Sequence, residues 1–92
     1  IYIGFEIIRN SGYRIKQTSL RKLELNKEFF KSAQIVLKRA SKTDTNIFLT
    51  MTELLIDELV KLGVSEEQIR IDNDEASADS NLEGLLLVYY FD

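Results

Sequence analysis

The chain contains neither cysteine nor histidine among its 92 residues. Without cysteine it forms no disulfide, no thiolate zinc site and no thiol nucleophile. Without histidine it lacks the commonest metal ligand and the side chain that most often serves as a general base near neutral pH. Only carboxylates, hydroxyls, lysine and tyrosine remain for chemistry, so we expect a protein that is not an enzyme and that carries no cofactor.

Proline and tryptophan are also absent, and no uncharged run is long enough to cross a bilayer. No basic segment followed by an apolar one opens the chain, so we expect no secretory signal. The lack of cysteine fits a reducing compartment, which favours a cytoplasmic protein without a membrane partner. With 45% hydrophobic and 29% charged residues, the composition is that of a globular protein, and the length predicts a single domain over residues 1–92.

The formal net charge of −3 is the sum of two halves of opposite sign. Residues 1–42 contain ten lysines and arginines and three glutamates, a charge of +7, whereas residues 43–92 contain two basic and twelve acidic residues, a charge of −10. This asymmetry indicates an electrostatic surface for a partner, although two halves that fold against each other would also neutralise one another.

The beginning of the chain has the pattern of a β-hairpin. Residues 1–9 alternate with the period of two that is typical of a strand. The turn signal Asn10-Ser11-Gly12 follows, and residues 13–17 alternate again. Three leucines between residues 20 and 25 predict that the second strand continues, with a bulge, to about residue 25.

The next segment has the pattern of an amphipathic helix over 27–41. Asn26 is a favourable N-cap, and Glu28 stands in the first turn, where the helix dipole favours an acid. Apolar residues at 29, 30, 33, 36, 37 and 40 occupy one arc of this helix. The opposite arc and the last turn are basic, and their residues are Lys27, Lys31, Lys38, Arg39 and Lys42.

A polar turn at 43–46 separates this helix from a short apolar segment, 47–49, that we interpret as a strand. Residues 50–53 match the capping box, and the helix that follows runs over 54–62 and ends before Gly63. The alternative is a helix that begins at Thr43 and includes 47–49.

The C-terminal part predicts two more strands. Ile69 and Ile71 lie on one face of a strand over 68–71, and the apolar run 85–91 predicts an interior strand that is covered on both faces. Segment 47–71 has the plan of a right-handed strand–helix–strand crossover. The order ββαβαββ predicts an α+β domain, with a mixed four- or five-stranded sheet packed against two helices.

Two groups of carboxylates deserve comparison with known chemistry. In the acidic loop 72–83, Asp72, Asp74 and Glu83 match places of the calcium-loop pattern, but Ala76 and Ser77 replace an obligatory ligand and the obligatory glycine. We therefore expect an ordinary polar loop and no metal site.

The second group lies on the predicted helix over 54–62 and its capping box. Glu53 and Asp57 are four residues apart, and Asp57 is expected to pair with Lys61 on a solvated face. Leu54 is then exposed among these charges, next to Glu58, as a contact point for a partner.

These observations favour a non-enzymatic protein-interaction or assembly module, such as an assembly subunit, an inhibitor or an immunity-type partner. It would bind another protein, or copies of itself head to tail, through segregated basic and acidic surfaces. The residues that we expect at the contacts are Lys31, Lys38, Arg39, Leu54, Asp57 and Glu58.

The alternative is a nucleic-acid-binding protein that uses the basic stripe of the first helix, extended by Arg14 and Lys16. The acidic second half argues against it, because it would repel a polyanion. The four glycines are isolated, so no phosphate-binding loop is present, and no motif indicates a particular family.

Overall fold

The computed structural model describes residues 1–9, 12–40, 43–75 and 84–91. Within these ranges the strands are β1 (Tyr2–Ile3), β2 (Phe5–Ile8), β3 (Gly12–Ile15), β4 (Gln34–Arg39), β5 (Ile69–Glu75) and β6 (Leu85–Tyr90). The helices are α1 (Gln17–Phe30), α2 (Thr45–Lys61) and the 3-10 turn η1 (Glu66–Gln68). With β1 and β2 counted as one interrupted strand, the order is the predicted ββαβαββ, and the α+β class is confirmed.

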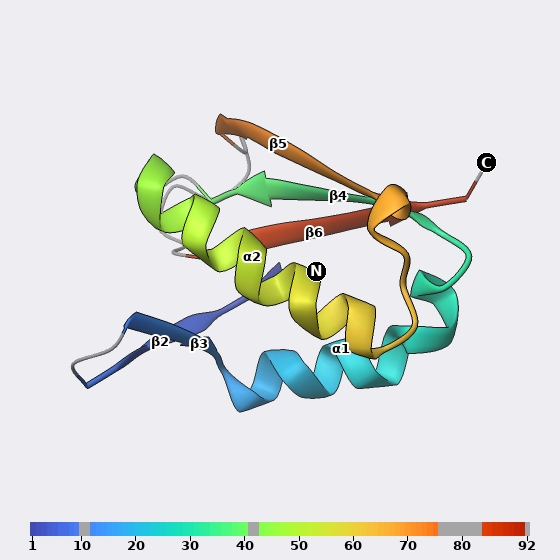
Figure 1. The fold of residues 1–92 in the computed structure, drawn as a ribbon, viewed down its shortest axis with the longest axis horizontal. Helices are drawn as coiled ribbons and strands as arrows, with labels where there is room; N and C mark the ends of the chain where they lie inside the picture. Colours follow the sequence, from blue (N-terminus) through green and yellow to red (C-terminus); the bar gives the residue numbers. More distant parts are fainter. Residues whose placement is uncertain (10–11, 41–42, 76–83, 92) are drawn as a thin grey trace.

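The sheet is mixed and four-stranded, in the order β1-β6-β4-β5 among the described strands, while β2 and β3 form a separate hairpin. Strand β6 is antiparallel to both neighbours, and β4 is parallel to β5. The chain passes from β1 to β4 through α1 and from β4 to β5 through α2, and both connections move towards the same edge of the sheet. Because such crossovers between parallel strands are right-handed, both helices lie on the same face of the sheet. Figure 1 shows strands β4, β5 and β6 above, with α1, α2 and the hairpin below them.

The hydrophobic core lies between this face of the sheet and the two helices. Strands β4 and β6 contribute alternate residues, and α2 contributes one side chain per turn. The large fully buried members are Ile3, Ile35, Leu37, Leu85 and Leu87 from the sheet, Leu23 and Phe30 from α1, and Phe48, Leu55 and Leu59 from α2. Each such side chain stabilises the fold by about 1.5–3 kcal/mol relative to an exposed one.

The predicted helix over 27–41 is wrong. Helix α1 spans Gln17–Phe30, and residues 34–39, which carried the second half of the proposed helical pattern, form β4. The consecutive residues Ile35, Val36 and Leu37 are all buried. Ile35 and Leu37 join the core on one face of the central strand β4, and Val36 lies on the other face, between Val88 of β6 and Arg70 of β5. Asn26 lies inside α1, where its amide donates to the Lys22 carbonyl instead of capping a helix.

The strand predicted to continue to residue 25 is also absent, because β3 ends at Ile15 and α1 begins two residues later. Leu20 and Leu23 turn inward with helical spacing, whereas Leu25 is 81% exposed. The three leucines therefore belong to helix α1, and a segment of six residues is too short for its helical period to be recognised.

The strand predicted over 47–49 is wrong, and the alternative helix is confirmed. Helix α2 begins at Thr45, where the side chain of Asp44 caps it by accepting a hydrogen bond from the Asn46 N–H at 2.8 Å. Phe48 is buried and Leu49 is exposed, as helical geometry requires. The crossover unit accordingly runs from β4 through α2 to β5. The predicted end at Gly63 is confirmed, since α2 ends at Lys61 and Gly63 has a positive φ.

Strand β6 is interior, as predicted, since it pairs with β1 and β4. The prediction that both its faces are covered is wrong, because Val88 is 43% exposed and Tyr90 is 44% exposed.

Strand β5 continues to Glu75, so the first four residues of the predicted acidic loop belong to a strand. The remainder of that loop, 76–83, lies outside the described residues.

Candidate interaction surfaces

The basic residues predicted to share one helix face lie on different elements. Lys31 is the C-cap of α1, while Lys38 and Arg39 lie on β4. The basic stripe as predicted is therefore not formed, because the helix that would carry it ends at Phe30.

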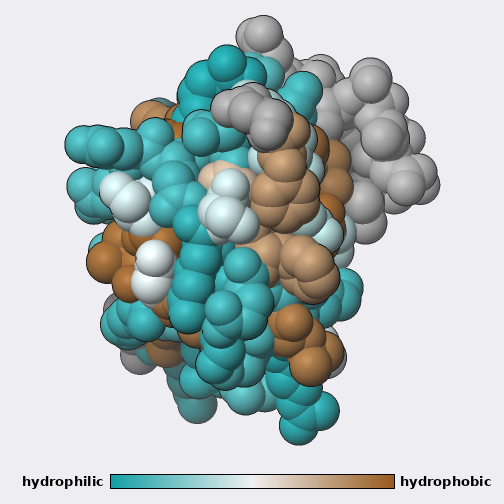
Figure 2. Space-filling view, turned by 90° about the vertical axis from the view of Figure 1, so that its right-hand side faces the viewer, coloured by the Kyte–Doolittle hydropathy of each residue, from teal (hydrophilic) through white to brown (hydrophobic). Residues whose placement is uncertain are grey.

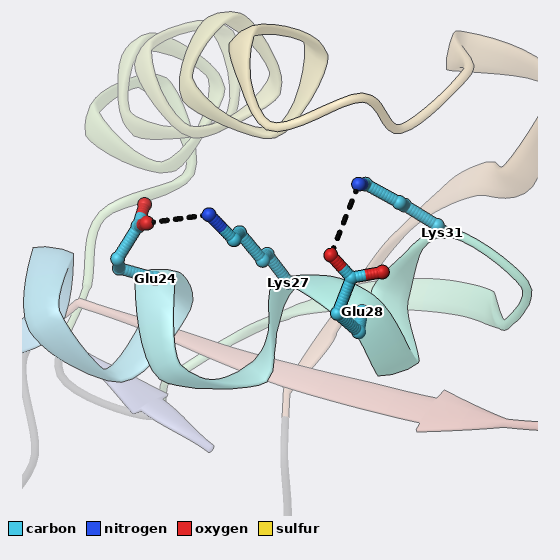
Figure 3. A network of polar contacts seen from close by, with 4 residues as sticks. All are labelled: Glu24, Lys27, Glu28 and Lys31. Atoms are coloured by element: carbon cyan, nitrogen blue, oxygen red, sulfur yellow. Dashed lines mark hydrogen bonds and ion pairs between the residues drawn. The ribbon is translucent and has the colours of Figure 1, made fainter.

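The lysines near the end of α1 are paired within that helix. Lys27 Nζ lies 2.8 Å from Glu24 Oε1, and Lys31 Nζ lies 3.2 Å from Glu28 Oε1 (Figure 3). The hydrogen bond to Glu24, together with the charges of Glu24 and Glu28, raises the pKa of Lys27. This part of α1 thus presents alternating charges rather than a positive surface.

Arg39 has a structural task at the end of β4. Its Nε donates to the Asn73 carbonyl of β5 at 3.3 Å, and its Nη1 donates to the Thr43 carbonyl at 3.0 Å. The guanidinium thereby ties β4 to β5 and to the segment that enters α2.

The predicted contact residues Leu54, Asp57 and Glu58 lie on α2, and two of them, Leu54 and Glu58, line one pocket. Leu54 and Glu58 are partly buried, whereas Asp57 is exposed. Lys61 pairs with Glu58 at 3.4 Å and not, as predicted, with Asp57. The pairing is therefore three residues apart on the helix instead of four.

This pocket, which we call the hairpin groove, measures about 410 Å³ and lies between α2, the start of α1 and the β2–β3 hairpin. Its residues are Glu6, Arg14, Ile15, Gln17, Leu20, Leu54 and Glu58. Arg14 Nε lies 2.6 Å from Glu6 Oε1, so the principal charges at its hairpin side already satisfy each other in an exposed pair. Sequence patterns did not reveal the groove, because it forms only where the hairpin approaches α2.

A different surface lies on the face of the four-stranded sheet opposite the helices, which we call the open face. It carries the residues that alternate with the core residues of β4, β5 and β6. These are Val36 and Lys38 from β4, Arg70 and Asp72 from β5, and Leu86, Val88 and Tyr90 from β6.

Strand register arranges these side chains in rows across the sheet. Val36 lies between Val88 and Arg70, and Lys38 lies between Leu86 and Asp72. Lys38 Nζ is 3.6 Å from Asp72 Oδ2, which is the ion pair expected of directly opposed charges on neighbouring strands. One row is therefore mainly apolar and the next ends in a charge pair.

Val36 lies on the open face and outside the hydrophobic core cluster. Its side chain is only 4% exposed, yet it is not part of the hydrophobic cluster that contains Ile35 and Leu37. Val36 stands between Val88 and Arg70 of the neighbouring strands, and both described helices lie on the opposite face of the sheet (Figure 1). Val88 and Tyr90 are exposed on this face, because no described helix lies over it. Hydrophobic side chains also reach the surface, between hydrophilic ones, on the side of the molecule shown in Figure 2.

The two oppositely charged halves of the chain alternate in the sheet. Strands β1 and β4 come from the basic half and β6 and β5 from the acidic half, so the order β1-β6-β4-β5 interleaves them. The Lys38–Asp72 pair joins the halves directly. The asymmetry of the sequence is thus distributed over neighbouring strands.

Neither a metal site nor a membrane span is found in the part of the chain that the structure describes. No three acidic side chains there are grouped as metal ligands would be, and neither helix is long and apolar enough to cross a membrane. Of the calcium-like pattern, Glu83 lies outside the described residues.

No protein-family model matches this chain, and no curated protein or solved structure shows significant similarity to it.

Proposed function

We propose that this chain is a non-enzymatic protein-interaction module that docks another protein on the open face of its sheet. The observation that carries the proposal is the exposure of Val88 and Tyr90 on a sheet face that no described helix covers. β-branched and aromatic side chains stabilise a sheet most when a second layer buries them. A partner that covered this face would supply that layer.

Charged groups beside the apolar row support a protein partner over a lipid or a small apolar molecule. Lys38, Asp72 and Arg70 border Val36 and Val88 on two sides. An apolar centre with a polar rim is the usual composition of a protein interface, in which the rim orients the encounter. Lys38 is the predicted contact residue that this surface contains.

The non-enzymatic character and the cytoplasmic location are parts of the same proposal. They are supported by the absence of histidine and cysteine. The hairpin groove, with Leu54 and Glu58, is a second region where the partner can contact the module.

Binding of nucleic acid has less support. Lys27 and Lys31 are each paired with a glutamate of the same helix, and Lys38 is paired with Asp72. A polyanion would have to displace these carboxylates before it could use the lysines.

The proposal is tested by placing a lysine on the open face. Val88→Lys adds a flexible charge to the apolar row, whereas the control Val60→Lys makes the same change on α2 at a residue of equal exposure, 45% against 43%. Each variant is immobilised, incubated with a cell extract, and its bound proteins are identified by mass spectrometry. We expect wild type and Val60→Lys to retain the same specific protein and Val88→Lys to lose it. Equal retention by Val88→Lys would refute the proposal.

A further inference from the structure

Strand β5 forms one edge of the four-stranded sheet. It has seven residues, and β4 is the strand with which it pairs in the described structure. Edge strands expose backbone groups to a further strand, and proteins usually protect them by shortness, charged side chains, proline or bulges. Strand β1 at the opposite edge has only two residues, whereas β5 has no proline and offers four residues, 69–72, before its register shifts. The charges in these four residues, Arg70 and Asp72, have opposite signs and so can pair with a second copy of the strand.

The regular part of β5 has a distinctive arrangement of side chains. Residues 69–72 pair in register with 35–38 of β4, and the register shifts after Asp72. Arg70 and Asp72 point to the open face, while Ile69 and Ile71 point to the helix side. Ile71 is 44% exposed, although it follows the more buried Ile69 on the same face. Charges of opposite sign therefore flank a partly exposed isoleucine.

We propose that two copies of this chain pair antiparallel along β5, with a two-fold axis through Ile71. In this register Arg70 of each copy lies directly opposite Asp72 of the other, so the pairing forms two symmetric ion pairs on the open face. Ile71 meets its own symmetry mate on the helix side. Opposite charges and apolar side chains on directly opposed residues both stabilise antiparallel pairs.

The charges also select this register over its neighbours. An axis through Asp72 would place that carboxylate opposite itself, and an axis through Arg70 would do the same with the guanidinium. Like charges at directly opposed positions destabilise a sheet. The self-complementary order of Arg70, Ile71 and Asp72 is therefore the feature that identifies a second copy as the occupant of this edge.

Pairing of this kind gives a closed, isologous dimer and not the head-to-tail assembly that the charge halves alone suggested. The two sheets become one continuous sheet, and both open faces lie on the same side of it. The inference goes beyond the proposed function and does not depend on it, because β5 can pair whether or not a partner covers Val88.

The absence of native cysteine makes a direct test possible. In Ile71→Cys the two thiols of a dimer are directly opposed across the axis, where the spacing of antiparallel residues permits a disulfide. The control Val60→Cys has nearly the same exposure, 45% against 44%, but lies on α2. Under a mild oxidant we expect Ile71→Cys to form a disulfide-linked dimer many times faster than Val60→Cys. Equal rates would overturn the proposed pairing.

Charge reversal then tests the register. In the Ile71→Cys background, Arg70→Asp places carboxylates opposite carboxylates, and Asp72→Arg places guanidinium groups opposite one another. Each variant alone should lose the fast crosslinking, and an equimolar mixture should recover it as a heterodimer, because the mixture restores two ion pairs. The control Arg21→Asp, an exposed change of the same charge on α1, should keep it. Failure of the mixture to recover would overturn the register.

A third experiment measures the mass of the wild-type protein in solution, so it requires neither a folded variant nor a partner protein. The mass of wild-type protein, measured by light scattering at rising concentration, should increase from 10.7 kDa towards twice that value, and a constant monomer mass would overturn the dimer. Val88→Lys should leave this association unchanged. If Val88→Lys loses the partner but wild type forms no dimer at any concentration, only the β5 pairing is refuted. If wild type dimerises but Val88→Lys keeps the partner, only the proposed function is refuted.

Discussion

Substitution of Thr43 by valine is expected to destabilise the fold although it adds an apolar group. Thr43 is 4% exposed, and its hydroxyl oxygen accepts a hydrogen bond from the Gly84 N–H at 2.7 Å while it donates to the Gly84 carbonyl at 3.1 Å. These bonds fasten the beginning of β6 to the segment before α2. They therefore hold β6, and with it the open face, in place.

The expected loss of stability in Thr43→Val depends on which group is left without a hydrogen-bond partner. In Thr43→Val the Gly84 carbonyl keeps the Ala40 N–H at 3.3 Å, but the buried Gly84 N–H is left without an acceptor. A buried donor without a partner costs about 1–3 kcal/mol. For a domain of this size, about 2 kcal/mol lowers the melting temperature by about 8–16 °C.

Thr43→Ser is the matched control, because it keeps the hydroxyl and removes one methyl group, worth about 0.8 kcal/mol. Melting temperatures from circular dichroism should therefore fall in the order wild type, serine, valine. If burial of apolar area determined stability at this site, valine would equal or exceed threonine. A valine variant that melts at or above the serine variant would refute the role of the hydroxyl.

Three further predictions, two of them with a control variant, test other parts of the fold by urea unfolding. Gly84→Ala should lower the free energy of unfolding by at least about 2 kcal/mol, because φ at Gly84 is +127° and the added methyl group would overlap the carbonyl oxygen of Ile3 in β1. An unchanged urea midpoint would contradict this backbone conformation. Gln68→Glu should lower the free energy of unfolding by about 1–3 kcal/mol, since the side-chain amide donates to three carbonyls at and after the end of α1 at 2.8–3.0 Å. The control Glu67→Gln changes an exposed neighbour and should leave the free energy of unfolding almost unchanged. Leu59→Ala should cost about 2–5 kcal/mol and Val60→Ala less than about 0.5 kcal/mol, and similar losses would mean that the inward face of α2 is assigned wrongly.

The candidate surfaces were only partly predictable. Sequence patterns identified Leu54 and Glu58 as neighbours on a helix, and the structure places both in the hairpin groove. Their companions Glu6 and Arg14 are about forty to fifty residues away in the chain, and no local pattern joins them. Lys38 was noted for its charge, but its opposition to Asp72 depends on the register of two strands separated by α2.

The errors within the fold have a common physical origin. A helical arc could be drawn through residues 29–40 because the apolar residues at 29, 30, 33, 36, 37 and 40 share one face at helical spacing. Ile35 lies off that arc, and the unbroken run Ile35, Val36 and Leu37 is equally compatible with a strand. Tertiary pairing decided between helix and strand, since β4 lies between β6 and β5 and pairs with both along its length. Local propensity has less weight than the burial that a central strand gains.

The sequence by itself determined the α+β class, the approximate order of elements, the end of α2 at Gly63 and the apolar strand near the C-terminus, because these follow from local periodicity and from the conformational freedom of glycine. It also determined which chemistry the chain lacks. Only the tertiary structure decided that the acidic and basic halves alternate in one sheet, that Val88 and Tyr90 face outward, and that β5 is an edge with Arg70 and Asp72 side by side on one face. Strand order and register are set by contacts between distant segments, and those contacts place each charge and each apolar side chain at the surface or in the core.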